Sequence, residues 1–407
     1  MRIDVRVTRE DEHDDFSRTF LAAILQDPPS PALLEKRLPG YLAMRPFGAY
    51  ECGEMIGTAG AWPFDMAVPG GARIAVAGVT AVGVLPTHTR RGALTRMMHA
   101  QLTDAAERGQ PVAILGASES VIYGRFGYGL ATTAANLKIH KRHTRFSPEL
   151  VDPGRTRLVE REKALEMLPG LYDRYGRDRP GSLNRPSYRW ERWYGAPVEG
   201  EDAPPNIFVI HEDAKGRPDG FLVYALVGRP SWDEKGARIE IHDLWGDPSV
   251  YGPLWRYALE IDLIDEIDAW MRMPDEPLRW MLADPRRLEM KLEDHLWLRV
   301  LDVPFALAAR TYRGPGRLVL EIADPFLDRG GRFEIDVDET GAATCKPSRR
   351  VADLELSMAD LGALYLGGLS FSALAAAGRV HERKAGALSR ADHLFAHHPA
   401  PWCGTFF

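Results

Sequence analysis

The sequence has few cysteines and no long apolar segment. Its 407 residues include three widely separated cysteines, Cys52, Cys345 and Cys403. This spacing predicts neither a disulfide framework nor a thiolate metal site. No apolar run approaches the length that spans a bilayer, and the first residues contain no apolar signal segment. We therefore expect a cytoplasmic protein that does not act at a membrane.

A basic excess and several catalytic motifs are also missing. The formal net charge of −6 argues against a general nucleic-acid binder. The sequence lacks the Gly-x-Ser-x-Gly of serine hydrolases, the His-Glu-x-x-His of zinc proteases and the Gly-Lys-Ser/Thr of a P-loop. His397 and His398 are adjacent, but no third ligand accompanies them at a recognisable spacing, so no metal site is expected.

What is present predicts an α/β (α+β) protein with several domains, because 407 residues exceed one ordinary core. A charged stretch with Pro and Gly at residues 141–155 is typical of a linker. We expect a first domain over 1–150 and a second over 151–293, which repeats the order of elements without a basic turn. A third domain, over 294–407, begins near the run 296–301.

Three local patterns give further expectations. Residues 185–194 mix arginines with Trp and Tyr, which predicts an amphipathic helix that packs its rings and leaves its arginines in water, rather than an RNA-binding segment. Residues 279–282 predict a short strand. The chain ends on two aromatic residues, Phe406 and Phe407, and an apolar end predicts a docked tail.

The stretch 79–98 joins a β-branched run to a basic turn and an amphipathic helix. Apolar residues recur at helical spacing: Leu94, Met97, Met98, Leu102 and Ala105. Gly109 stands where a C′ glycine would end the helix. Free N–H groups at the helix N-terminus, with Arg90 and Arg91, would hold a diphosphate, and Gly92 would allow close approach. A solvated helix start is the alternative.

Polar and aromatic residues follow the next apolar run, 111–116. Ser118 and Glu119 come first, and then Tyr123 and Tyr128 in a segment punctuated by glycines. Ligands bind beyond such strand ends in open α/β sheets. A phenol with a pKa of about 10 can protonate a thiolate, whose acid has a pKa of about 8.5. The alternatives are a polar turn and tyrosines that only pack in a loop.

The stretch that contains the basic turn, together with three others, resembles sequences of a known protein family. The stretch 82–92, Val-Gly-Val-Leu-Pro followed by Arg-Arg-Gly, resembles the acetyl-CoA signature of GNAT N-acetyltransferases. Three further stretches, 117–129, 296–304 and 361–368, together with the end at Phe407, resemble the Eis (enhanced intracellular survival) family across essentially the whole chain.

The resemblance implies a fold and an activity. The fold would be an N-terminal GNAT domain over 1–150, a degenerate GNAT-like domain over 151–293 and a sterol-carrier-protein-like domain over 294–407, assembled as a homohexamer. The activity would be acetyl-CoA-dependent N-acetyltransfer to small-molecule amines, aminoglycosides at more than one position among them, without a metal. The alternative class is a lipid-binding or scaffolding protein whose GNAT domain is inactive.

The resemblance also implies roles for individual residues. Tyr123 would be the general acid, Tyr128 a packing residue, and the α-carboxylate of Phe407 the general base. The implied acetyl-CoA contacts are Val82, Gly83, Val84, Arg90, Arg91, Gly92, Ala93, Leu94, Thr95, Ser118 and Glu119.

The tail departs from what a polycationic acceptor needs. Aminoglycosides favour an acidic pocket, yet the penultimate residue is Phe406 and no acid follows Asp392. Acids near the first predicted helix, Asp14, Asp15 and Asp27, are the other candidates for such a field. Acetyl transfer to amines is therefore better supported than transfer to aminoglycosides.

Overall fold

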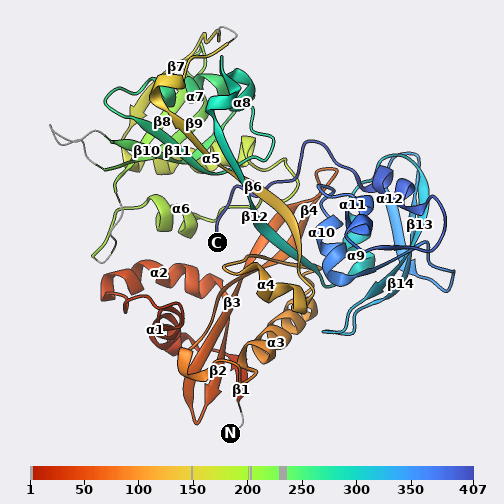
Figure 1. Cartoon of the computed structure of the whole chain (residues 1–407). Coiled ribbons are helices and arrows are strands. Elements are labelled where there is room, and N and C mark those ends of the chain that lie inside the picture. Colours follow the sequence, from red (N-terminus) through yellow and green to blue (C-terminus); the bar gives the residue numbers. More distant parts are fainter. Residues whose placement is uncertain (1–2, 148–149, 200, 202–203, 229–235) are drawn as a thin grey trace. The chain divides into compact units, whose positions relative to one another are not determined.

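The computed structural model describes residues 3–147, 150–199, 201, 204–228 and 236–407 (Figure 1). Contacts divide the chain into two compact units. Unit 1 consists of residues 1–132, 179–183 and 294–407, and unit 2 of residues 133–178 and 184–293. The boundaries at 150 and 293 stay predictions. None of the helices within the described ranges is long and apolar enough to cross a membrane.

Unit 1 contains a mixed sheet. Its strands follow the order β1 (Asp4–Val7), β2 (Arg45–Glu51), β3 (Glu54–Ala67), β4 (Arg73–Val84), β5 (Val112–Gly116) and the C-terminal half of β12 (Glu289–Val300). Strands β4 and β5 are parallel, and the other neighbours are antiparallel. Cys52 and Gly53 turn the β2–β3 hairpin with φ of 52° and 88°, the left-handed backbone that a tight hairpin needs.

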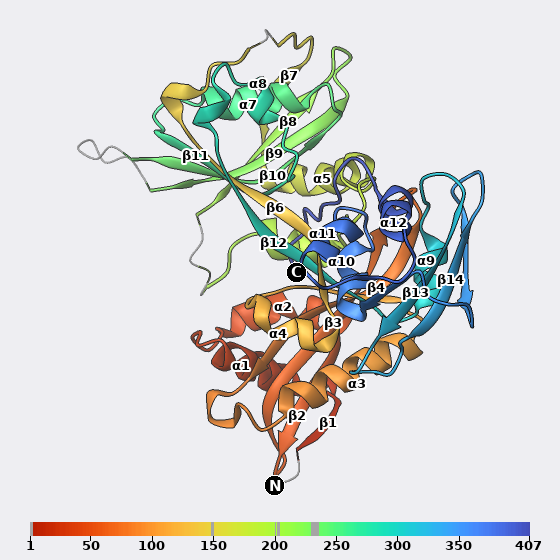
Figure 2. The ribbon, with the colours of Figure 1, turned by 45° about the vertical axis from the view of Figure 1, so that its right-hand side comes forward.

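Helices cover both faces of this sheet: α1 (His13–Ala23), α2 (Pro31–Ala43), α3 (Ala93–Glu107) and α4 (Ser120–Tyr123) (Figures 1 and 2). A Cβ on Gly57 would meet Met97 of α3, and one on Gly83 would meet Ala23 of α1. Gly57 pairs with Val84, the neighbour of Gly83, so α1 and α3 lie on opposite faces.

The amphipathic helix predicted after the basic turn is confirmed as α3. Its apolar stripe is buried at Met97, Met98, Leu102 and Ala105. The helix ends just before Gly109, which takes a φ of 77°. Sequence reasoning missed α2, because Pro39 lies inside that helix and breaks the usual pattern.

The C-terminal part of unit 1 forms a five-stranded sheet. Its order is β15 (Ala343–Pro347), β14 (Gly331–Val337), β13 (Gly316–Ala323), β16 (Leu354–Ser357) and β17 (His381–Glu382). The accompanying helices are α9 (Val303–Ala309), α10 (Met358–Leu364), α11 (Phe371–Ala376) and α12 (Ala387–Phe395). One apolar core joins the two sheets, since Ile74 and Ile114 of the first belong to the same buried cluster as Leu320 and Leu364.

The run 296–301 lies largely within a strand of unit 1. Residues 296–300 form the end of β12, which pairs with β5 from Leu296↔Gly116 to Val300↔Val112. This strand carries the chain out of the first sheet and directly into α9. The sequence did not show this, because long-range pairing leaves no local signal.

The strands of unit 2 also pair in mixed directions. Their order is β6 (Gly129–His140, of which residues 133–140 belong to this unit), β11 (Glu266–Arg272), β10 (Arg238–Gly246), β9 (Pro218–Val227), β8 (Asn206–Glu212) and β7 (Arg155–Val159). Its helices are α5 (Arg161–Tyr175), α6 (Ser187–Tyr194), α7 (Tyr251–Glu260) and α8 (Leu278–Met281). Strands β10 and β11 are parallel, as β4 and β5 are in unit 1.

Two sequence-based expectations for this region were wrong. Residues 279–282 are mostly helix α8, not a strand. Arg185 and Arg189 are 7% and 5% exposed instead of solvated, because the Asp243 carboxylate lies 2.7 Å from the Arg185 guanidinium inside the unit. The expected linker at 141–155 contributes residues to unit 2; positions 148 and 149 in it lie outside the described residues.

Candidate active site

The parallel ladder between β4 and β5 is short. It pairs residues 76–78 with residues 112–114 and ends at Gly78. Beyond that point β4 continues to Val84 in register with β3 alone. Within the described chain, the β5-facing backbone of residues 79–84 therefore has no strand partner. Its N–H groups can serve a ligand.

A β-bulge bends β4 just after the ladder ends. Ala81 takes a φ of 49°, and the register with β3 shifts between Thr58 and Gly60. The Thr58 hydroxyl donates to the Ala81 carbonyl at 2.8 Å, which fixes the bulge. The predicted cofactor residues Val82, Gly83 and Val84 follow it and are half-buried.

The predicted anion turn has an open helix N-terminus. Arg90 and Gly92 take φ of 62° and 86°. The first intrahelical hydrogen bond of α3 runs from the Arg96 N–H to the Gly92 carbonyl at 3.1 Å, so the N–H groups of residues 93–95 have no helical acceptor. Gly92 supplies no side-chain cap, and a Cβ added there would meet no atom within 4 Å. Such a site fits a diphosphate.

The two predicted guanidiniums differ in their surroundings. Arg91 lies 2.5 Å from the Glu51 carboxylate of β2, which is 8% exposed. His88 lies 3.5 Å from the same carboxylate. Arg90 makes no ion pair within the described residues. Sequence reasoning missed Glu51, which stands 40 positions before Arg91 in a strand that carries no motif.

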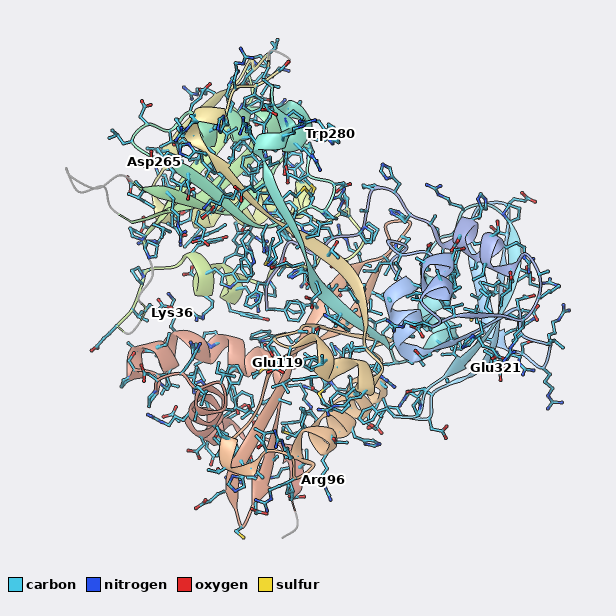
Figure 3. All side chains as sticks on the ribbon, in the orientation of Figure 1. Lys36, Arg96, Glu119, Asp265, Trp280 and Glu321 are labelled. Carbon is cyan, nitrogen blue, oxygen red and sulfur yellow. The ribbon has the colours of Figure 1, made fainter. Side chains whose placement is uncertain are left out.

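Tyr123 ends α4 and is 6% exposed. Burial and the nearby Glu119 carboxylate raise the pKa of its phenol above the ordinary value. Its hydroxyl has no hydrogen-bond partner in the part of the chain that the structure describes, so it is available as a donor. Glu119 and Ser118 are exposed in the loop before α4 (Figure 3).

Tyr128 packs edge-on against Tyr123, with ring centroids 6.0 Å apart. The ring is fully buried, and its hydroxyl is unpaired within the described residues. Burial raises the pKa of this phenol too. Tyr128 is thus a packing residue in the geometry observed.

The docked tail brings Phe407 to the end of the β4–β5 ladder. Its ring lies 5.2 Å from the Phe64 ring of β3, and a Cβ on Gly78 would approach it to 3.3 Å. Upstream, Trp402 and Thr405 are buried, and the Trp402 N–H donates to the Pro180 carbonyl at 2.8 Å. The predicted docking of the tail is confirmed. The last residue and the first domain's sheet therefore belong to one packed region.

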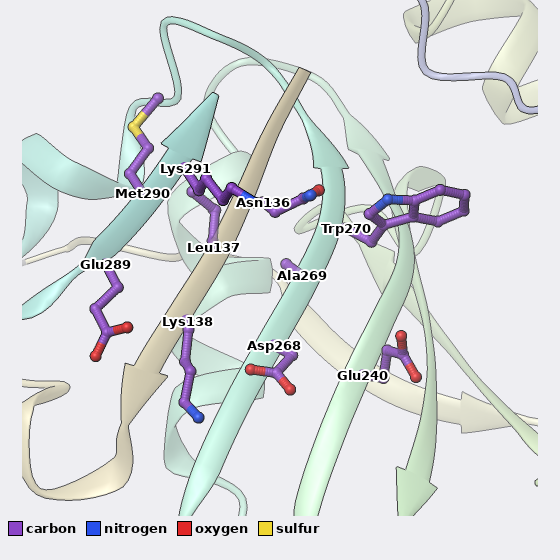
Figure 4. Close-up of a pocket in the computed structure, with 10 residues that line it drawn as sticks. All are labelled: Asn136, Leu137, Lys138, Glu240, Asp268, Ala269, Trp270, Glu289, Met290 and Lys291. Carbon is purple, nitrogen blue, oxygen red and sulfur yellow. The ribbon is translucent and has the colours of Figure 1, made fainter. Parts of the chain in front are cut away.

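A separate groove of about 460 Å³ lies on the sheet of unit 2 (Figure 4). Its walls come from β6, β10, β11 and β12, and no predicted site residue lines it. Its charges are mostly paired: Lys138 lies 2.9 Å from Glu266, and Lys291 lies 2.5 Å from Glu293. Within the described ranges, no group of three or more His, Cys, Asp or Glu residues could hold a metal ion.

Comparison with known families assigns most of the chain. Residues 4–131 and residues 181–300 each match a model described as an acetyltransferase (GNAT) domain. Residues 303–404 match a sterol carrier protein domain.

Individual relatives agree with these matches. The chain is 38% identical to an uncharacterized N-acetyltransferase of Streptomyces coelicolor, over 99% of both chains. It is 35% identical to the N-acetyltransferase Eis of Mycobacterium bovis, over 86% of this chain and 85% of the relative. The crystal structure of Eis1 from Mycobacterium abscessus matches the fold with a TM-score of 0.87 at 34% identity, covering 100% of both chains.

Proposed function

The chain belongs to the Eis family of GNAT N-acetyltransferases, and we propose that it transfers the acetyl group of acetyl-CoA to small-molecule amines, with aminoglycosides among the acceptors. It contains two GNAT domains and a C-terminal domain like sterol carrier proteins. The observation that carries the proposal is the position of Phe407. Its ring lies where β4 leaves β5, next to the strand that leads to the anion turn.

Acetyl-CoA would be held along β4 and at the start of α3. The open N–H groups of Ala93, Leu94 and Thr95, with Arg90 and Arg91 at the turn, would bind its diphosphate. Backbone groups at residues 82–84 would bind the arm that carries the thioester, and Ser118 with Glu119 would contact the same ligand beyond β5.

The first chemical step needs a base that takes the proton of the acceptor ammonium, and hydrogen-bond donors for the negative charge that develops on the thioester oxygen. The Phe407 carboxylate accepts a proton from the acceptor ammonium through water, and the freed nitrogen attacks the thioester carbonyl. A free α-carboxylate is a weak base, with an ordinary pKa of about 3.3 to 3.7, so it acts through its position. Unpaired N–H groups near Val82 and Val84 stabilise the oxyanion.

The second step breaks the carbon–sulfur bond: the nitrogen gives up its remaining extra proton to water, the carbonyl re-forms, and the electron pair of the broken bond leaves with sulfur. Tyr123 donates its phenolic proton to that thiolate. Because the pKa of Tyr123 is raised, the phenol stays protonated until it is needed. No acyl-enzyme forms in this scheme.

The base assignment is tested by extending the chain. A short tag after Phe407 converts the α-carboxylate into an amide, so turnover should be lost while acetyl-CoA still binds in isothermal titration. The same tag at the N-terminus is the control and should change neither. Full activity of the C-terminally tagged enzyme would remove the carboxylate from the mechanism.

The acid assignment is tested by Tyr123→Phe. Loss of a general acid costs roughly 10²- to 10⁴-fold in rate, and we expect kcat to fall with little change in acetyl-CoA affinity. Tyr128→Phe is the matched control, since it removes a hydroxyl that has no partner in the described chain. Wild-type kcat in Tyr123→Phe would sink the assignment.

The acceptor is tested with a panel of monoamines and aminoglycosides in a thiol-release assay. The exposed carboxylates of Asp14 and Asp15 at the start of α1 would favour polycations. Lipid binding without CoA release would favour the alternative of a lipid-binding protein with an inactive GNAT domain. We further propose a cytoplasmic homohexamer, which light scattering and sedimentation would test.

A further inference from the structure

The Arg299 side chain of β12 packs against Phe126 and Gly127, in the segment that follows Tyr123. Its side chain is fully buried. One guanidinium nitrogen donates to the Asp324 carboxylate at 2.6 Å, and the other donates to the Phe126 carbonyl. Asp324 in turn accepts from the Arg329 N–H at 3.2 Å. A charge-assisted pair thus joins the C-terminal domain to the backbone three residues after Tyr123.

Glycines allow this segment to pack closely against its support. A Cβ on Gly127 would lie 1.8 Å from the Arg299 guanidinium, and one on Gly129 would lie 1.8 Å from the Ala359 carbonyl of α10. Gly127 also takes a φ of 82°. Larger residues cannot fit at either position without moving the backbone.

The segment is coupled to Tyr123 by its own short contacts. The Tyr128 N–H donates to the Tyr123 carbonyl at 3.3 Å, and the Gly127 N–H donates to the Gly124 carbonyl at 3.0 Å. The Phe126 ring packs 5.0 Å from the ring of Phe326, two residues after Asp324. A shift of the Phe126 backbone would therefore move the Tyr123 phenol.

We propose that Arg299, held by Asp324, is a positioning residue that places the Tyr123 phenol for proton donation, so that the C-terminal domain orients the general acid as well as supplying the terminal carboxylate. This inference rests on the proposed role of Tyr123. It explains why a guanidinium is buried against this glycine-containing segment, where an apolar side chain would pack but could not hold the Phe126 carbonyl.

A double-mutant cycle between Arg299→Lys and Tyr123→Phe tests the proposal. Lysine keeps the charge, but its single ammonium cannot reach both Asp324 and the Phe126 carbonyl in the fork geometry of arginine. We expect Arg299→Lys to lower kcat about 10- to 100-fold, as a misplaced catalytic group does, and to change the KM for acetyl-CoA less than twofold. In the Tyr123→Phe background, Arg299→Lys should cause no further loss.

Arg310→Lys is the matched control. Arg310 is also fully buried in the C-terminal domain, but it donates to the carbonyls of Tyr365 and Phe395. This variant should lose stability and keep its kcat. Equal losses of kcat in Arg299→Lys and Arg310→Lys would overturn the positioning role of Arg299. So would a full further loss of kcat when Arg299→Lys is added to Tyr123→Phe. Neither result would affect the acid assignment of Tyr123. A fully active Tyr123→Phe would overturn the acid assignment itself. If Arg299→Lys does not fold, Asp324→Asn takes its place in the cycle.

Discussion

The turn before α3 and the turn before α7 both follow strands paired in parallel, yet the first carries arginines and the second a carboxylate. Before α3, the N–H groups of residues 93–95 are unpaired within the helix and Arg90 stands beside them. Before α7, an acidic residue stands in the loop: the Asp247 carboxylate accepts from the Ser249 N–H at 3.0 Å and from its hydroxyl at 2.7 Å. These hydrogen bonds lower the pKa of Asp247. A diphosphate would meet a fixed negative charge.

The two parallel ladders also end differently. In unit 1 the β4–β5 ladder ends at Gly78, and the ring of Phe407 lies there. In unit 2 the β10–β11 ladder ends at Ile241, and Arg272 then reaches the Leu244 carbonyl at 3.1 Å and the Tyr251 hydroxyl at 2.8 Å. A buried polar network fills the place where unit 1 keeps strand N–H groups for a ligand. Unit 2 thus has internal hydrogen bonds at the position where unit 1 has backbone groups without a strand partner.

The largest predicted effect concerns this network. Arg272→Met leaves the Glu276 carboxylate, which is 1% exposed, without its cation. Breaking a buried pair costs about 3–5 kcal/mol, so the free energy of unfolding of unit 2 should fall by that amount in denaturant titration. Acetyl-CoA affinity should not change. The control is Arg238→Met, which breaks a half-exposed pair with Asp268 at 3.5 Å and should cost at most about 1 kcal/mol.

The next largest effect is expected when the turn of unit 1 is given a carboxylate, as the loop before α7 has in Asp247. Arg90→Asp removes one cation and adds one anion at the open turn, and Asp tolerates the left-handed backbone there. Because one charge-assisted hydrogen bond contributes about 1.5–3 kcal/mol, the Kd for acetyl-CoA should rise about 100-fold in isothermal titration. Asp247→Ala in unit 2 should leave it unchanged. An unaltered Kd in Arg90→Asp would show that the charge at this turn does not control acetyl-CoA binding.

Substitution of Glu51 should lower the Kd for acetyl-CoA, by a smaller factor than Arg90→Asp raises it. Glu51→Gln keeps an acceptor for Arg91 but removes the negative charge 2.5 Å from that guanidinium. Acetyl-CoA should bind about three- to tenfold more tightly, which corresponds to the modest energy of a charge interaction near the surface. The gain should shrink as salt is added. Weaker binding would mean that Glu51 acts by holding Arg91 in place.

The smallest effect is on the pH profile. An acid must be protonated to act, and the raised pKa of Tyr123 shifts its deprotonation to higher pH. The alkaline loss of kcat should therefore begin above about pH 10, the ordinary value for a phenol, and should be absent in Tyr123→Phe. The buried phenol of unit 2, Tyr251, donates instead to Glu276 at 2.8 Å and has no such role. If kcat already fell well below pH 10, the ionising group would not be Tyr123.

The sequence predicted the local parts of the site and missed its distant partners. The helix α3, its end before Gly109 and the open turn at Gly92 follow from residues within one stretch, because periodicity and glycine placement act locally. Glu51 and Arg299 could not be found this way. Each reaches the site from another strand. Glu51 belongs to no motif, and the stretch 296–304 contains Arg299 without indicating its contacts.

Burial of charge was the main source of error. The arginines of residues 185–194 were expected in water, since solvated arginine is the usual case. Arg185 is buried because Asp243, 58 positions later, supplies a bidentate partner at 2.7 and 3.1 Å. A pairing of that range leaves no trace in the local pattern.

By itself, the sequence determined helix α3, the glycine-containing turn before it and the apolar tail, because each depends on residues that are neighbours along the chain. Only the tertiary structure decided that Phe407 lies at Gly78, that Arg299 donates to the Phe126 carbonyl, and that Arg272 donates to the Leu244 carbonyl. These contacts join residues far apart in sequence, and packing of the whole core, rather than local preference, brings them together.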